Sequence, residues 1–387
     1  MSDTVEYLRR DEPEPPGEEI LHREDGTGLC LSGGGYRAMV FHLGALWRLN
    51  ELGYLPQINR ISSVSGGSIT AAVLGVNWHD LAFDENGISQ RFIEKCVNPV
   101  RRMADTTIDK SSIIGGVFGP GSVNKRVIKA YREYLFGQKT LQDLPDDTEG
   151  PRFVINAANV QSGVLCRFSK PYIWDYRVGR IDSPKLQIAE AVAASSAFPP
   201  VLSPAVFHFE ANQFAPNSGT DLQKPPFTTK LYLTDGGVYD NLGLETVWKR
   251  YKTIFVSDGG GRLQPEEKPA SNWASHALRI GSMVDRQVRS LRYRELINAY
   301  ISGEISGAYW GTFTNIAGYK VPTPFNCPIE KTSELAKIGT RLVKMPSITQ
   351  EKLINWGYAV CDAALRAYFD EGIPLPTDFP YPDSPIA

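Results

Sequence analysis

The chain has 387 residues, of which 42% are hydrophobic and 22% are charged, so its composition is that of an ordinary globular protein. Its formal net charge of −2 gives no field that favours nucleic acid, and no nucleic-acid partner is expected. Five scattered cysteines favour neither a disulfide framework nor a metal site, so the sequence predicts a cytoplasmic setting and no metal or other cofactor. No stretch resembles a signal peptide or a membrane span.

The order of patterns along the chain predicts one large α/β domain with an arm at each end. Residues 1–25 are acidic and contain prolines, so they are expected to form a flexible arm. Residues 374–387 form a proline-rich tail. The single domain between them, 26–373, is expected to divide into a recognisable core, 28–262, and a C-terminal helical part, 263–373.

Apolar runs bounded by polar residues or glycine predict strands in five places, at 29–32, 58–64, 152–160, 230–234 and 252–258. Between the first two strands, Leu43, Leu46 and Leu49 recur at helical spacing and predict a helix that ends near Gly53. A strand, a helix and a strand in this order form a right-handed parallel crossover. Residues 78–147 are mostly helical in pattern and are expected to form an inserted helical cap.

Three glycines, Gly33, Gly34 and Gly35, directly follow the first predicted strand. Their bare N–H groups at the start of a helix can hold an oxyanion. The same pattern through Ala38 fits a dinucleotide fingerprint, but that interpretation needs a carboxylate where the second strand ends in serine. A purely structural tight turn is the third interpretation. Arg37, one turn into the helix, is expected to steady the loop or to attract a phosphate-bearing substrate.

A serine at a sharp corner follows the second predicted strand. Ser65 precedes Gly66 and Gly67 in a pattern like the nucleophile elbow G-x-S-x-G, with Ser63 in the place of the first glycine. Such a corner needs small neighbours because the turn is strained and crowded. The pattern therefore predicts Ser65 as a nucleophile, and the N–H of Gly66 as a further oxyanion donor.

The group that would activate this serine is a carboxylate or a histidine. Asp235 ends the fourth predicted strand, and Gly236 and Gly237 after it leave room for access. Asp258 also ends a strand before glycines, so the residue pattern alone leaves both aspartates as candidates. A carboxylate that acts directly as a base needs a raised pKa, most simply in an apolar, dehydrated pocket. None of the histidines lies in a motif; they are His22, His42, His79, His208 and His276.

Two alternative functions follow from other residues. The order Ser65, Asp235, His276 fits that of α/β-hydrolases, which would make the chain a conventional Ser–His–Asp esterase. A basic helix pattern near residue 280 favours a helix that lies on an anionic membrane, in a binding module with weak or no hydrolase activity. The basic residues of this pattern are Arg279, Arg286, Arg289, Arg292 and Arg294.

Together these motifs resemble the patatin-like phospholipase family in its bacterial form. SGGGYRA, SVSGG and DGGVYDN are similar to its oxyanion, serine-elbow and aspartate motifs, and residues 189–200 are similar to its small-residue segment before the substrate pocket. The resemblance covers about 28–241. It implies a three-layer α/β/α sandwich with a mainly parallel central sheet. It also implies hydrolysis of lipid acyl esters, of phospholipase A or lysophospholipase type, by a Ser–Asp dyad that needs no histidine or metal.

By match to the motifs, the dyad carries over to Ser65 and Asp235, and Val238 and Asn241 favour Asp235 over Asp258. The resemblance implies a lipid or membrane-surface substrate and therefore peripheral contact with a membrane. The implied oxyanion and substrate-binding residues are Gly33, Gly34, Gly35, Arg37 and Gly66, and the supporting residues are Ser63, Gly67, Gly236 and Gly237. Two departures are Ser32, where many members have aspartate, and Ser63 in the elbow.

Overall fold

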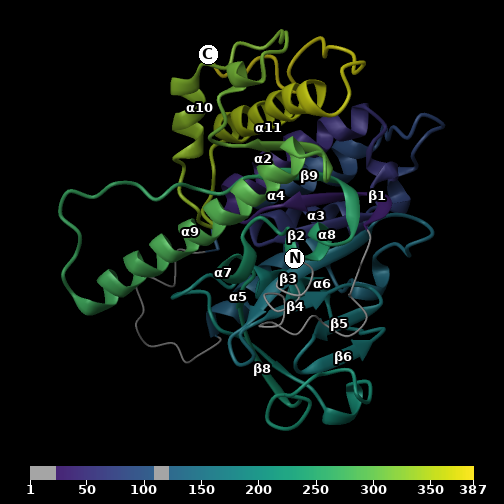
Figure 1. Cartoon of the computed structure of the whole chain (residues 1–387), viewed down its shortest axis with the longest axis vertical. Coiled ribbons are helices and arrows are strands. Elements are labelled where there is room, and N and C mark those ends of the chain that lie inside the picture. Colours follow the sequence, from purple (N-terminus) through teal and green to yellow (C-terminus); the bar gives the residue numbers. More distant parts are fainter. Residues whose placement is uncertain (1–22, 109–121) are drawn as a thin grey trace, which may run out of the picture.

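The structure is a computed structural model that describes residues 23–108 and 122–387. Within these ranges the chain forms a ten-stranded sheet in the order β10-β9-β1-β2-β3-β4-β5-β6, with β8 paired to both β3 and β7 (Figure 1). The strands are β1 (Glu24–Leu31), β2 (Arg60–Val64), β3 (Arg152–Asn159), β4 (Leu165–Phe168), β5 (Tyr172–Asp175), β6 (Gly179–Asp182), β7 (Ala205–His208), β8 (Lys230–Asp235), β9 (Tyr251–Asp258) and β10 (Ser306–Gly311).

The sheet is mixed, and the five neighbouring strands from β10 to β3 are parallel. The pairs beyond β3, and those that involve β7 and β8, are antiparallel. The helices are α2 (Gly35–Glu51), α3 (Gly66–Val76), α4 (Asn98–Ala104), α5 (Ser122–Tyr131), α6 (Ile188–Ser195), α7 (Gly237–Asp240), α8 (Glu245–Trp248), α9 (Trp273–Ile301), α10 (Ile329–Ala336) and α11 (Ser347–Tyr368).

Two buried clusters on opposite faces of the sheet define three layers. Leu29 and Leu31 of β1 belong to the larger cluster, which α2, α3 and α11 complete. Cys30, between them, belongs to a smaller cluster with residues of α8 and α9. Because successive side chains of a strand point to opposite faces, β1 is buried on both sides, as in a parallel sheet between helices. The predicted fold class, an α/β/α sandwich with a mainly parallel sheet, is confirmed.

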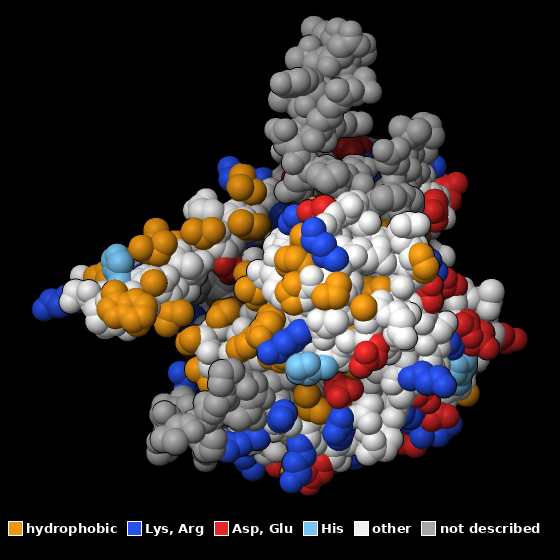
Figure 2. Space-filling view, turned by 90° about the horizontal axis from the view of Figure 1, so that it is seen from below, with side chains coloured by type: hydrophobic (Ala, Val, Ile, Leu, Met, Phe, Trp, Pro, Cys, Tyr) orange, Lys and Arg blue, Asp and Glu red, His pale blue; other side chains and the backbone are white. Residues whose placement is uncertain are grey.

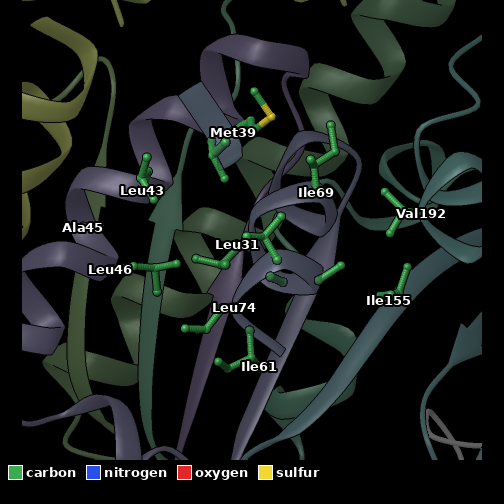
Figure 3. Close-up of a cluster of buried hydrophobic side chains, with 14 of the residues drawn as sticks. Leu31, Met39, Leu43, Ala45, Leu46, Ile61, Ile69, Leu74, Ile155 and Val192 are labelled. Carbon is green, nitrogen blue, oxygen red and sulfur yellow. The ribbon is translucent and has the colours of Figure 1, made fainter. Parts of the chain in front are cut away.

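The larger cluster fixes the helix that follows each of the first two strands. Figure 3 shows Leu43 and Leu46 of α2 beside Leu31 of β1, and Leu74 of α3 beside Ile61 of β2, all fully buried. Apolar side chains recurring at helical spacing bury one face of each helix against the sheet, so both strand-to-helix corners are held in place. These corners carry the glycine turn and the serine elbow.

All five predicted strands are present, and so are the helix predicted between the first two strands and the helix predicted near residue 280. The described parts of 78–147 are largely helical, and α4 and α5 pack against α2, α3 and α6. The C-terminal part, 263–373, was expected to be helical, and this is wrong at β10, which extends the sheet beside β9. Its sequence, SGAYWG, is short and contains two glycines, so no strand pattern was visible.

The two predicted arms have different outcomes. Most of the N-terminal arm, residues 1–22, lies outside the described residues, and Glu24 already begins β1. The proline-rich tail lies against α11, where the side-chain amide of Asn355 donates to the carbonyls of Tyr381 and Ser384 at 2.9 Å each. Ile386 near its end is buried.

Candidate active site

Strand β3 brings the predicted nucleophile and base together. β2 runs parallel to β3 and ends with Val64 opposite Asn156. β8 runs antiparallel and ends with Asp235 opposite Ala157, the next residue along. Since β4 occupies the other edge of β3, β2 and β8 share one edge and their C-terminal ends meet. Ser65, the residue after Val64, therefore lies beside Asp235.

Ser65 sits on a strained corner between β2 and α3, with φ 52° and ψ −118°. A non-glycine residue with positive φ is uncommon and persists only where surrounding structure fixes it. Here Gly66 packs directly against the Gly35 backbone and Gly67 against the Leu31 carbonyl, so a side chain at either position would collide with the glycine turn. The two motifs are thus in contact, as the acyl-transfer interpretation requires.

A network of serine hydroxyls stabilises this corner. The N–H of Ser65 donates to Oγ of Ser195 at 2.9 Å, and Oγ of Ser195 donates to the carbonyl of Asn156 at 2.6 Å. Ser68 contacts Ser195 and donates to Ser63, which donates to a β3 carbonyl. Ser63 therefore belongs to the support of the elbow. Ser195 was not predicted, although it lies in the small-residue segment 189–200.

The glycine turn offers fewer free donors than expected. The N–H of Gly33 donates to the carbonyl of Asn241 at 3.1 Å, so the prediction that Gly33 contacts an oxyanion is wrong. The N–H groups of Gly34, Gly35 and Gly66 have no recorded partner among the described residues. As unpaired donors at the starts of α2 and α3, they lie where the helix dipoles also favour negative charge.

Arg37 is not a substrate-binding residue. Its side chain is buried, and its guanidinium donates to the carbonyls of Gly259, Ala336 and Ile338. These bonds tie the start of α2 to the end of β9 and to the segment after α10. The prediction of a phosphate contact by Arg37 is wrong, and the alternative expectation, that it steadies the loop, is confirmed.

Asp235 is 2% exposed, and one of its oxygens accepts from the N–H of Gly237 at 2.8 Å. Its other oxygen, Oδ2, has no partner that satisfies hydrogen-bond geometry. Burial raises the pKa of Asp235 to about 7, although the Gly237 N–H and the nearby Ser65 hydroxyl lower it in part. The charge of Asp285 on α9 raises it further. Gly236 packs against the Asn156 carbonyl, where a side chain would not fit.

Both carboxylate oxygens of Asp258, the other candidate aspartate, accept hydrogen bonds. Its carboxylate accepts from Arg289, Ser32, Tyr309 and the N–H of Gly260. Burial alone would raise the pKa of Asp258, but the charge and hydrogen bonds of Arg289, with those of Tyr309 and Gly260, hold it below its ordinary value. A carboxylate stabilised in its charged form is a poor base. The contact with Ser32 also explains the serine before the glycine turn.

No described histidine serves either Ser65 or Asp235. His208 and His276 are exposed, on β7 and α9. His42 is buried, but its two ring nitrogens contact Ser257 Oγ at 2.7 Å and the Ser32 carbonyl at 2.9 Å. Burial lowers its pKa to about 4, so the ring is neutral. The triad alternative therefore has no support among the described residues.

Helix α9 stands out from the body, with only Leu296 and Ala299 buried (Figures 1 and 2). Arg289 and Arg292, two of the five arginines in the predicted basic pattern, form ion pairs within the protein. Arg289 pairs with Asp258, and Arg292 pairs with Asp240 and Glu245. Its exposed large apolar side chains are Trp273, Leu278, Ile280, Met283, Val284, Leu291, Tyr293 and Ile301.

A serine on a strand-to-helix corner of an α/β sheet, beside unpaired backbone donors, is typical of serine ester hydrolases. The family model described as patatin-like phospholipase matches residues 29–248. The chain belongs to the patatin-like phospholipase family, and membership supports a lipid hydrolase function.

Similar solved structures include human GIVD cytosolic phospholipase A2 in complex with methyl gamma-linolenyl fluorophosphonate, at 14% identity and a TM-score of 0.46, covering 94% of this chain and 60% of that chain. Another structure of human GIVD cytosolic phospholipase A2 matches at 15% identity and a TM-score of 0.38. The match covers 67% of this chain and 45% of that chain. VipD from Legionella pneumophila matches at 15% identity and a TM-score of 0.34. The match covers 88% of this chain and 66% of that chain. The chain therefore spans 60% of the first human chain and 45% of the second. No curated protein matches the chain.

Two features of residues 23–108 and 122–387 bear on membrane and metal partners. No helix there has the length and apolarity needed to cross a membrane. In the same ranges, no three or more histidine, cysteine, aspartate or glutamate side chains are grouped so that they could hold a metal ion.

Proposed function

We propose that the chain hydrolyses acyl esters of lipids, as a phospholipase A or lysophospholipase, through an acyl-enzyme on Ser65 with Asp235 as general base. The main support is the shared edge of β3, which sets the ends of β2 and β8 against each other. The raised pKa of Asp235 adds to this, because a base with a pKa near the working pH transfers protons best.

In the first half of the reaction, Asp235 takes the proton of Ser65 Oγ as this oxygen attacks the ester carbonyl. The N–H groups of Gly34, Gly35 and Gly66 hold the oxyanion that forms. Each such donor contributes about 3 kcal/mol in comparable enzymes. The bond to the leaving alcohol then breaks, and the alcohol oxygen receives the proton from Asp235.

In the second half, water gives a proton to Asp235 and attacks the acyl-enzyme. The bond between Ser65 Oγ and the acyl carbon breaks, and Asp235 returns the proton to Oγ. The products are a free fatty acid and the alcohol part of the lipid. Asp235 serves both halves, so neither a histidine nor a metal is needed.

Substitution of either dyad residue tests the proposal. Ser65→Ala and Asp235→Asn are expected to lower release of fatty acids at least a thousandfold, because the nucleophile or its base is lost. Release is measured by mass spectrometry over a panel of phospholipids, lysophospholipids and acylglycerols. The matched controls, Ser302→Ala on the surface and Asp182→Asn on β6, are expected to keep the wild-type rate.

Turnover that persists in folded Ser65→Ala protein contradicts the proposal. The triad alternative is tested in the same assay with His208→Ala and His276→Ala, which are expected to keep full activity. A large loss in either histidine variant would favour a Ser–His–Asp esterase.

We also propose that α9 contacts the lipid surface from which the substrate is drawn. Its exposed apolar side chains include Trp273, which is 85% exposed, and Ile280 and Val284, which lie about two and three helical turns further along the same face. Isolated apolar residues on a surface are normal, but a row of them along one protruding helix is typical of an interaction site. The same helix carries Asp285, whose charge acts on Asp235, so this surface lies close to the site.

A further inference from the structure

Four buried polar atoms near the dyad lack hydrogen-bond partners. They are Oη of Tyr36, Oη of Tyr131, Oγ of Ser196 and Oδ2 of Asp235. Each of these residues is at most 3% exposed. An unpaired polar group in a protein interior costs about 1–3 kcal/mol, so several of them around one point indicate a site that a ligand completes.

Backbone contacts place Ser196 next to Asp235. The N–H of Asp235 donates to the carbonyl of Ala197 at 3.0 Å, and that of Gly236 donates to the carbonyl of Ser195 at 3.4 Å. Ser196 lies between these two acceptors, directly after α6. The last turn of α6 and the end of β8 therefore run side by side, so Ser196 and Asp235 belong to neighbouring segments.

The two tyrosines extend this group toward the glycine turn. Tyr131 is the last residue of α5, which packs against α6. Burial raises the pKa of Tyr131, the nearby hydroxyl of Ser196 lowers it in part through a weak hydrogen bond, and the charge of Asp235 raises it further. Tyr36 follows Gly35 in α2, and its pKa is raised by burial and by Tyr131, so the two tyrosine hydroxyls are neighbours. Both tyrosines stay protonated and can donate.

The charge around these atoms selects the ligand. Among the described residues, the charges that act on Asp235, Tyr131 and Tyr36 come from aspartate and tyrosine side chains, with no lysine or arginine contributing. A phosphate would be repelled by Asp235 and would find no cation. An uncharged O–H group fits instead, because it donates to the carboxylate while it accepts from the hydroxyls.

We propose that Tyr131, Ser196 and Asp235 form a hydroxyl-binding subsite, which holds the leaving alcohol in acylation and the attacking water in deacylation, with Tyr36 contacting the rest of the alcohol. This inference rests on the proposed function. The alcohol oxygen leaves from the same side of the acyl carbon that water later attacks, so one position serves both. In each case the bound oxygen exchanges a proton with Asp235 while its bond to the acyl carbon breaks or forms.

Competition between water and glycerol as acyl acceptors tests the subsite. Water contacts only the subsite of Tyr131, Ser196 and Asp235, whereas glycerol is large enough to reach Tyr36 as well. Tyr131→Phe and Ser196→Ala are therefore expected to shift the ratio of fatty acid to acylglycerol at least threefold toward acylglycerol, and Tyr36→Phe to shift it toward fatty acid. The same reactions, followed by intact-protein mass spectrometry, are expected to show acylated Ser65 accumulating in Tyr131→Phe and Ser196→Ala.

Matched controls remove hydroxyls that already have partners away from the subsite. Tyr300→Phe loses a bond to the Ile254 carbonyl, and Ser169→Ala loses a bond to the Phe153 carbonyl; both are expected to keep the wild-type ratio. A purely structural role would lower all rates together and leave the ratio unchanged. Each variant removes one buried hydroxyl and adds no bulk, so both are expected to fold.

An unchanged ratio in folded Tyr131→Phe and Ser196→Ala, with no accumulated acyl-enzyme, overturns the subsite and leaves the dyad standing. Persistent turnover in Ser65→Ala would instead remove the proposed function itself. The two failures are therefore distinguishable.

Discussion

Two aspartates in similar sequence settings occupy opposite chemical environments. Asp258 is surrounded by four donors, including the guanidinium of Arg289, whereas Asp235 accepts one backbone N–H and keeps an unpaired oxygen. In a buried site, the presence or absence of a cation decides which form of a carboxyl group is stable. The contrast assigns ion pairing to Asp258 and leaves Asp235 as the group suited to exchange protons.

The pKa of Asp235 sets the expected pH dependence of hydrolysis. Only the ionised carboxylate accepts the proton of Ser65, and the pKa of Asp235 is raised to about 7. We expect kcat/KM to rise about tenfold per pH unit below 7 and to level off above it. The measurement uses a soluble ester whose leaving group does not ionise between pH 5 and 9. A constant kcat/KM over this range contradicts the assignment of Asp235 as the base.

The candidate site was predictable from sequence where chemistry depends on short local patterns. Strand-turn-glycine patterns predict Ser65 and leave Asp235 and Asp258 as candidates, and the family resemblance selects Asp235. The structure brings Ser65 and Asp235 together, while their roles stay predictions. Gly33 and Arg37 were wrongly assigned because their partners, Asn241 and the Gly259 carbonyl, lie more than 200 residues away in the chain. No local pattern reports such contacts.

At the level of elements, the position of α9 depends on a few charged side chains in its C-terminal half, which pair with groups in the body of the protein. Arg289 donates to Asp258 and to the carbonyl of Gly261, so it ties the helix to the loop after β9. The same loop accepts from Arg37 at Gly259, next to the glycine turn. The position of α9 and the conformation of the glycine turn therefore both depend on the loop after β9.

Removal of Arg289 is expected to destabilise the protein. Arg289→Met leaves Asp258 buried without its cation, and breaking such a pair costs about 3 kcal/mol or more. The free energy of unfolding is measured by urea denaturation. The double variant Arg289→Met/Asp258→Asn is expected to recover part of the loss, and Arg294→Met, whose guanidinium bonds only within α9, is the control. Equal stability of Arg289→Met and wild type contradicts the structural role.

The elements that sequence reasoning found and missed differ in length. The five predicted strands include the long central β1, β3 and β9, each of eight residues, whose apolar runs are continuous because both faces are buried. The missed strands β4, β5, β6 and β7 have four residues each, too few for a pattern of alternation. Whether such short strands form depends on pairing with neighbouring strands, and a local sequence pattern does not report that pairing.

For the whole molecule, the proposed contact with a lipid surface depends on the exposed apolar face of α9. We expect Trp273→Asp and the double variant Ile280→Asp/Val284→Asp to lower co-sedimentation with vesicles of phosphatidylcholine and phosphatidylglycerol at least fivefold. Each loses apolar contact with the bilayer. Hydrolysis of a soluble short-chain ester is expected to stay at the wild-type rate. The control is Lys268→Asp, in the loop before α9.

Wild-type vesicle binding in both aspartate variants contradicts the role of α9 as the lipid-contacting surface. A parallel loss of soluble-ester hydrolysis would indicate damage to the nearby site, which Asp285 already connects to the helix. Comparison of vesicles with and without phosphatidylglycerol separates the apolar contribution from that of Arg279 and Arg286, which lie on another face of α9.

The shared edge of β3 also has a consequence for the order in which the protein matures during synthesis. A ribosome releases residues 60–64 and 152–159 well before residues 230–235, so a nascent chain already carries its serine while the opposing carboxylate is still unmade. Domains generally fold as units as the chain emerges. Under the proposed mechanism, the pair of Ser65 and Asp235 is therefore incomplete until β8 docks onto β3.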